Sequence, residues 1–308
     1  MDPANLDAVS PYPTDLWPPT TGDSRMLLGY NTNGFAHHDP AEAMEVLAKI
    51  GYRAVGLTID HGVLNPRDAR LGDEAGKLRR LAKKLGLTLV VETGARYLLD
   101  PWEKHEPTLV SADPERRSSR GFFYEQAIDT AKEVGAECVS LWSGVVHDGA
   151  GAAEAWERLV GGMIPVLRRA EQCGVRVAFE PEPGMLVATL ADWRELRERL
   201  LVAGAPIDAL RLTIDVGHLH CNGETPLDEQ ITRHADDLVN VHLEDMREGV
   251  HEHLMFGEGE IDFPPVFAAF KAIGYTGPVC VELSRHSHAA PQVAQRAFDF
   301  LQRVGEDG

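Results

Sequence analysis

The sequence lacks the features that mark a membrane-spanning or disulfide-stabilised protein. No apolar run approaches the roughly 20 residues that a helix needs to cross a bilayer. Cysteine is scarce, and Cys138, Cys173, Cys221 and Cys280 are far apart with no CxxC pair. Cys138 and Cys280 stand inside apolar runs, where we expect small core residues. The pattern predicts no disulfide framework and a reducing, cytoplasmic location.

Basic residues are also in short supply. Lys and Arg number 30 against 48 Asp and Glu, so the formal net charge is −18. This field repels phosphate backbones and membrane surfaces, so we expect neither nucleic acid nor a membrane as a partner. A surplus of carboxylates is compatible with a site in which a divalent cation compensates them.

The N-terminal 25 residues are acidic and proline-rich. They lack the basic start and apolar middle of a secretory signal, so they do not resemble a targeting segment. We expect residues 1–25 to form a loosely ordered arm over the domain or a neighbouring subunit, which allows a homo-oligomer. Residues 26–308 are expected to form the catalytic domain.

From Met26 onward the chain alternates short apolar runs with longer helical patterns. Asp39-Pro40 predicts a helix start, and glycines close several of the helices. The expected helices are 40–50, 68–85, 121–134, 152–173, 190–202, 226–236, 263–273 and 290–304. The expected strands are 26–30, 54–59, 87–91, 138–142, 175–179, 210–214, 238–241 and 279–281. This rhythm predicts a single (β/α)₈ TIM barrel, because a doubly wound sheet would usually show a glycine-rich turn after the first strand.

Six of the eight expected strands end in an ionisable residue: Asp60, Glu92, Glu180, Asp215, His242 and Glu282. Active sites of such barrels lie at the carboxyl ends of the strands. Glu180, Asp215, His242 and Glu282 follow four strands that adjoin in the barrel, so they can close around one ion. Their oxygen-rich set favours Mn²⁺, Mg²⁺ or Co²⁺ and can also hold Zn²⁺. The alternative for Asp215 is that it caps the following helix.

One connection, between Glu92 and about residue 121, is much longer than a typical βα loop. It holds His105 and an arginine cluster of Arg116, Arg117 and Arg120. We interpret it as a lid or substrate-contacting loop. The alternative is a solvated excursion.

Several motifs resemble those of the sugar phosphate isomerase/epimerase superfamily. They are FEPEPG (179–184), DVGHLH (215–220), VHLED (241–245), GEGEID (257–262) and VEL (281–283). This xylose isomerase-like barrel group also contains ketose 3-epimerases, inosose dehydratases and endonuclease IV-type enzymes. The resemblance implies that Glu180, Asp215, His242 and Glu282 bind one divalent metal. It also implies that Glu180 and Glu282 are the acid/base pair that removes and returns a proton next to a carbonyl, with His218 bound to a substrate oxygen.

Further substrate contacts are expected from Glu182, Arg247, His253, Trp142 and His105. Glu182 could replace an acid that ketose epimerases usually have at the position of Leu186. Arg247 is near the place of a family arginine but out of register.

His251 and His253 resemble a metal-binding pair of the endonuclease branch and could hold a second metal. That branch also needs histidines at the ends of strands three and four, where this chain has Glu92 and Trp142.

The sequence thus predicts a divalent-metal-dependent isomerase or epimerase that acts on a small carbohydrate-like substrate. The first alternative is a metal-dependent lyase of the inosose or dehydroshikimate dehydratase kind, or one that cleaves keto-glycosides. It would use the same enolate and a general acid such as His253 or His105. The sequence also leaves open an endonuclease IV-like nuclease and a non-enzymatic barrel.

Overall fold

A computed structural model describes residues 26–307, and its centre is a closed barrel of parallel strands. Around the barrel the strands follow the order β1, β10, β7, β6, β5, β4, β3, β2. Their bounds are β1 Leu27–Asn31, β2 Ala54–Thr58, β3 Thr88–Glu92, β4 Cys138–Leu141, β5 Arg176–Phe179, β6 Leu210–Asp215, β7 Leu238–Leu243 and β10 Pro278–Val281. The predicted (β/α)₈ barrel is therefore confirmed. The predicted arm, residues 1–25, lies outside the described residues.

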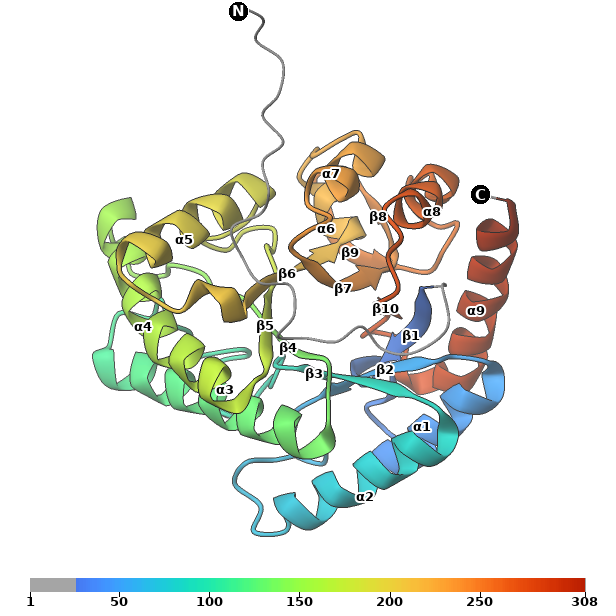
Figure 1. The fold of residues 1–308 in the computed structure, drawn as a ribbon, viewed down its shortest axis with the longest axis horizontal. Coiled ribbons are helices and arrows are strands. Elements are labelled where there is room, and N and C mark those ends of the chain that lie inside the picture. The colour runs from blue at the N-terminus through green and yellow to red at the C-terminus, as the bar shows by residue number, and fades with distance from the viewer. Residues whose placement is uncertain (1–25, 308) are drawn as a thin grey trace, which may run out of the picture.

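Helices form the outer layer and surround the barrel on all sides in Figure 1. They are α1 Pro40–Ile50, α2 Leu71–Leu85, α3 Pro114–Val134, α4 Ala152–Cys173, α5 Leu190–Val202, α6 Val216–Cys221, α7 Leu227–Arg233, α8 Phe263–Ala272 and α9 Ala290–Asp307. Within residues 26–307, no helix is long and apolar enough to span a membrane.

Local sequence signals explain where many helices begin and end. The Asp39 side chain accepts a hydrogen bond from the Ala41 amide at 2.9 Å, and Pro40 starts α1 as predicted. Gly86, Gly135 and Gly174 end α2, α3 and α4 in the left-handed conformation that glycine adopts without strain. The strands are buried on both faces, β2 throughout, which is why they read as continuous apolar runs. Cys138 and Cys280 are buried and the four cysteines are unpaired, as expected.

The start of α3 differs from the prediction. The helix begins at Pro114 rather than near residue 121, because Asp113 caps it by accepting from the Glu115 amide at 2.8 Å. Asp113-Pro114 repeats the signal of Asp39-Pro40. Arg116, Arg117 and Arg120 therefore lie on a helix and not in a loop.

Two further elements extend the carboxyl face of the barrel. The short helix α6 follows β6 directly, so His218 and His220 are helical residues. An antiparallel hairpin of β8 Asp245–Arg247 and β9 Val250–Leu254 follows β7. Both elements place histidines beside the barrel mouth.

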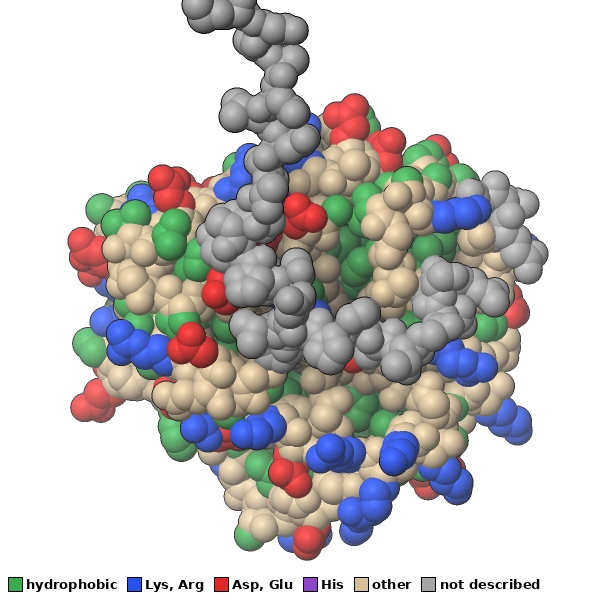
Figure 2. Space-filling model, in the orientation of Figure 1, with side chains coloured by type: hydrophobic (Ala, Val, Ile, Leu, Met, Phe, Trp, Pro, Cys, Tyr) green, Lys and Arg blue, Asp and Glu red, His purple; other side chains and the backbone are tan. Residues whose placement is uncertain are grey.

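The negative charge is not gathered into one acidic surface on the face drawn in Figure 2. Acidic and basic side chains are intermingled there over the outer helices. The ordered clustering of carboxylates is instead found inside the barrel mouth.

Candidate active site at the carboxyl end of the barrel

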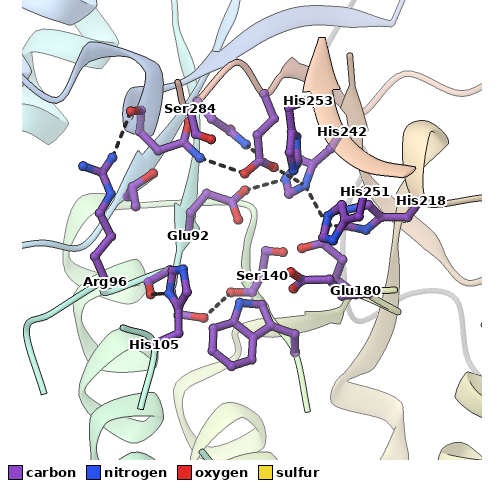
Figure 3. Close-up of a pocket in the computed structure, with 18 of the residues that line it drawn as sticks. Glu92, Arg96, His105, Ser140, Glu180, His218, His242, His251, His253 and Ser284 are labelled. Carbon is purple, nitrogen blue, oxygen red and sulfur yellow. Dashed lines mark hydrogen bonds and ion pairs between the residues drawn. The ribbon is translucent and has the colours of Figure 1, made fainter. Parts of the chain in front are cut away.

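A cavity of about 310 Å³ opens at the carboxyl ends of the strands. Figure 3 shows Glu92, Glu180, His218, His242 and His105 pointing into it from different elements. Most of the expected site residues line the cavity. They are Glu180, Glu182, His218, His242, His253, Glu282, Trp142 and His105.

His242, at the end of β7, is at the centre of the acidic group. Its Nδ1 lies 3.0 Å from Glu180 Oε1 and 3.0 Å from Glu282 Oε2. Its Nε2 lies 3.0 Å from Glu92 Oε1. A carboxylate only accepts, so without a metal ion both ring nitrogens donate, Nε2–H to Glu92 and Nδ1–H to the other two carboxylates.

Asp215 joins the same group from the end of β6. Its Oδ1 accepts from the His218 amide at 2.9 Å, so Asp215 does cap the helix that follows, α6. Its Oδ2 is buried and has no hydrogen-bond partner among the described residues. In Asp215, therefore, Oδ1 caps the helix and Oδ2 remains available to bind another group.

The four side chains suit a divalent metal ion. Donor atoms of Glu180, Asp215, His242 and Glu282 all lie within 4.8 Å of one another. Ligands at about 2.1 Å from one ion are at most about 4.2 Å apart, so small side-chain adjustments would close the set. Asp215 Oδ2, which makes no hydrogen bond with the described residues and lies 3.6 Å from His218 Nε2, fits such an ion, as does the donor chemistry of three carboxylates and one imidazole. The role of Glu92 matches the carboxylate that commonly orients a metal-binding histidine.

Two asparagines from the end of β1 hold Glu282, and nothing in the sequence marks them beyond their place after a strand. Asn33 Nδ2 donates to Glu282 Oε1 at 2.7 Å, and Asn31 Nδ2 lies 3.5 Å from Oε2. Gly56 makes room for this, since a Cβ there would be 1.9 Å from the Asn31 side-chain oxygen.

Burial and the charges in the cavity shift the pKa values of the two catalytic candidates, Glu180 and Glu282, in opposite directions. Burial raises the pKa of Glu180 to about 7. Burial also opposes ionisation of Glu282, but the charge and hydrogen bond of His242 outweigh it and lower the pKa of Glu282. His242 itself is buried, yet the charges of Glu180, Glu92 and Glu282 raise its pKa well above the ordinary value. One glutamate is thus set to hold a proton and the other to be ionised.

A cluster of three histidines adjoins this group. His218 Nε2 lies 3.0 Å from His251 Nε2, and donor atoms of His218, His251 and His253 fall within 4.8 Å of one another. Burial lowers the pKa of His218 to about 4. His253 Nδ1 lies 3.6 Å from Oε2 of the fully buried Glu244, a residue of the VHLED motif for which the sequence predicts no role.

Glu182 and Trp142 line the cavity as expected, whereas Arg247 does not. Burial, followed by the charges of Glu180 and Glu282, raises the pKa of Glu182 to about 8. Arg247 is exposed on β8 and donates to the Glu258 carbonyl at 2.8 Å. The structure therefore does not bring Arg247 to the cavity with the other expected residues.

The long connection after β3 forms one wall of the cavity. Gly94, Arg96, Lys104 and His105 line it. The arginines at the start of α3 anchor it from outside: Arg116 pairs with Asp100 at 2.9 Å, and Arg117 donates to the Ser111 carbonyl at 2.7 Å. The connection is therefore an anchored part of the cavity rather than a solvated excursion.

Comparison with known proteins gives one family match and several relatives. Residues 44–304 match the family described as xylose isomerase-like TIM barrel. An inosose dehydratase of Lacticaseibacillus casei is 32% identical over 146 residues, which cover 42% of this chain and 47% of the dehydratase. The chain thus spans less than half of that relative. The L-ribulose-5-phosphate 3-epimerase UlaE of Shigella flexneri is 26% identical over 243 residues, covering 79% of this chain and 81% of the epimerase.

A solved structure shares the fold. The IOLI protein, determined with a bound zinc atom, superposes with a TM-score of 0.70 at 18% identity, over 92% of this chain and 99% of that one. The closed parallel barrel and the family match over most of the chain agree. The protein belongs to the xylose isomerase-like TIM barrel family.

Proposed function

We propose that the protein is a divalent-metal-dependent epimerase or isomerase that transfers a proton next to the carbonyl of a sugar or related polyhydroxy compound. The observation that supports this most strongly is the convergence of Glu180, Asp215, His242 and Glu282, whose donor atoms lie within 4.8 Å of one another, with all but the buried Asp215 lining one cavity. The sugar 3-epimerase relative, which covers 79% of this chain, supports the same chemistry.

These four residues would hold the ion. When bound, it would polarise the substrate carbonyl and stabilise the negative charge that develops beside it. Mn²⁺, Mg²⁺ and Co²⁺ suit the oxygen-rich set, and the zinc in the IOLI structure supports Zn²⁺ as another occupant.

Glu282 and Glu180 would transfer the proton. One of them would remove the proton as a base, and the other would return a proton on the opposite face of the substrate carbon. Both lie 3.0 Å from the same imidazole nitrogen, which links their charges. His218 lies between them and the hairpin and would bind a substrate oxygen.

A lyase is the second candidate, and two observations favour it. The inosose dehydratase relative matches part of the chain at 32% identity. In addition, burial opposes protonation of His253, but Glu244 outweighs it and raises the pKa of His253 to about 10. A protonated imidazole beside the cavity could donate to a departing hydroxyl group.

The two candidates separate by their products. Protein stripped with EDTA and reloaded with Mn²⁺ would be incubated with L-ribulose 5-phosphate, D-tagatose, D-fructose and an inosose, and the products would be identified by NMR. We expect an epimer or isomer of one sugar, formed only with metal. A dehydrated product would assign the lyase. No conversion of any compound, or conversion that persists after EDTA treatment, would overturn the proposal. Measured metal content gives a further check: three ions per chain would favour the nuclease.

A further inference from the structure

His105 lies on the cavity wall formed by the long connection, apart from the predicted metal ligands. It is half-buried, and its ring lines the cavity. Figure 3 shows it on the opposite side of the cavity from His218 and His251. Its surroundings define what this imidazole can do to a substrate.

Gly94 fixes the tautomer of His105. The Nδ1 atom lies 2.7 Å from the Gly94 carbonyl oxygen. A carbonyl oxygen can only accept, so Nδ1 has the hydrogen and donates it. In the neutral ring Nε2 is then a bare acceptor, and no described residue hydrogen-bonds to it. Burial lowers the pKa of His105 to about 4, which keeps the ring neutral near pH 7.

The backbone of His105 is held on both sides. Its amide donates to the Arg96 carbonyl at 2.7 Å, and its carbonyl accepts from Arg120 Nη2 at 2.9 Å. The residue has a φ of 67°, a left-handed conformation that persists in non-glycine residues only where the surroundings enforce it. The ring packs edge-on against Trp142, with centroids 5.7 Å apart at 88°.

Arg120 is unusual because it is a fully buried arginine without an ion-pair partner in the described part of the chain. Its guanidinium carbon lies 4.5 Å from the centre of the Trp142 ring, and its Nε and Nη1 have no described hydrogen-bond partner. Burial of such a group is costly unless its remaining contacts are needed. Those contacts are to the rings of Phe123, Tyr124 and Trp142 and to the His105 carbonyl, and the last two hold the Trp142 ring and the His105 backbone in this wall.

We propose that His105 is a specificity-determining residue that accepts a hydrogen bond from a substrate hydroxyl group through Nε2, and that Arg120 positions it. This inference rests on the proposed function. A phosphate, carboxylate or keto oxygen offers only lone pairs to Nε2. The part of the substrate that faces Nε2 is therefore a hydroxyl group and not a phosphate, carboxylate or keto group. A neutral acceptor also cannot protonate a leaving group, which removes His105 as the general acid of a lyase.

The tautomer can be tested without any knowledge of the reaction. Long-range ¹H–¹⁵N NMR of protein labelled at histidine, with His105→Gln to assign the signals, reports which nitrogen is protonated. We expect Nδ1–H and a bare Nε2 from pH 5.5 to 8. An Nε2–H tautomer or an imidazolium would overturn the proposal. The Nε2 signal should also shift on addition of at least one of D-tagatose, D-fructose or L-ribulose 5-phosphate, and no response to any of them would overturn it equally.

Kinetics test the specificity. With the sugar that the metal-loaded enzyme converts, His105→Phe should raise KM roughly three- to tenfold, the range for one neutral hydrogen bond, with little change in kcat. One monodeoxy analogue, lacking the recognised hydroxyl, should show equal KM with both proteins. His37→Phe, an exposed histidine outside the cavity, is the control. An equal loss with every analogue would refute the inference while leaving the proposed function intact.

Arg120 has its own readout. Arg120→Leu should raise KM as His105→Phe does and alter the His105 ¹⁵N signals, which a purely structural role would not. Arg120→Lys keeps a donor for the His105 carbonyl and should restore most of the KM, even where the leucine variant folds poorly. Unchanged His105 signals in both variants would refute the positioning role.

Discussion

Replacement of Glu92 by Gln should weaken metal binding although Glu92 is not among the four proposed ligands. Glu92 is buried, and its Oε1 accepts from His242 Nε2 at 3.0 Å. Asn240 Nδ2, 3.3 Å away, donates to the same oxygen. The carboxylate thereby fixes the histidine with Nδ1 directed at Glu180 and Glu282. Gln keeps the shape but removes the charge.

The size of the effect follows from this hydrogen bond. A bond to a charged acceptor contributes about 1.5–3 kcal/mol and a neutral one about 0.5–1.5 kcal/mol. The difference, about 1–1.5 kcal/mol, corresponds to a roughly tenfold loss of metal affinity. Carboxylates that orient metal-binding histidines commonly change affinity by about 10–100-fold, so we expect the lower part of that range.

A competition titration of Mn²⁺ against a fluorescent chelator, at one pH and ionic strength, measures this change. Glu106→Gln is the matched control, since Glu106 is a partly buried carboxylate of the neighbouring connection that pairs with His147 at 3.3 Å. We expect the control to bind Mn²⁺ as the parent does. An affinity of the Glu92 variant within twofold of the parent, or an equal loss in the control, would refute the role given to Glu92.

Three further predictions concern stability. The pKa of Glu182 is raised to about 8 in the folded protein, so the folded state retains a proton that the unfolded state loses near pH 4.5. The contribution of Glu182 to the stability of EDTA-treated protein should therefore fall as pH rises between these values. Glu182→Gln removes this dependence, so its Tm advantage should grow from pH 4.5 to 8; a constant difference contradicts the assignment. Asp245 accepts from four backbone amides of the chain that follows it, so Asp245→Ala should cost at least about 4 kcal/mol in urea unfolding, and a loss below about 1 kcal/mol would contradict this. A Cβ at Gly217 would lie 2.0 Å from Glu244 Oε1, so Gly217→Ala should lower the free energy of unfolding by about 1–3 kcal/mol. The double variant Gly217→Ala/Glu244→Ala should recover part of this loss. Equal stability of the parent and the Gly217→Ala protein would contradict the prediction.

Much of the barrel could be predicted from the sequence because its strands are short, buried on both faces and separated by helices with clear caps. The four residues at the ends of β5, β6, β7 and β10 could be placed together for the same reason, since parallel strands of a closed barrel bring their carboxyl ends to one mouth. The sequence marks Glu92 only as another acid at the end of a strand. Its contact with His242 crosses the barrel, and sequence spacing contains no information on such a pairing.

Other parts of the site had weak sequence signals. Asn31 ends β1 and Asn33 lies in the short 3₁₀ helix that follows, and asparagine at such a junction usually serves the backbone. The apolar pattern that predicted β6 did not show that DVGHLH turns at once into α6, and the hairpin that holds His251 and His253 is only a few residues long. The early start of α3 was in the sequence, at Asp113-Pro114, but the surrounding charges resemble those of a loop.

Incorporation of solvent deuterium is the sharpest check of the proposed proton transfer. Metal-loaded protein would be incubated in D₂O with the sugar that it converts, and the label would be located by NMR in substrate and product. We expect deuterium at the carbon next to the carbonyl, dependent on metal and lost in Glu282→Gln protein that still folds. A proton that is transferred within the site without exchange with solvent would also give conversion without deuterium, so the glutamine variant is the decisive test. A Glu282→Gln protein that binds metal and exchanges deuterium at the parent rate would contradict the proposed mechanism.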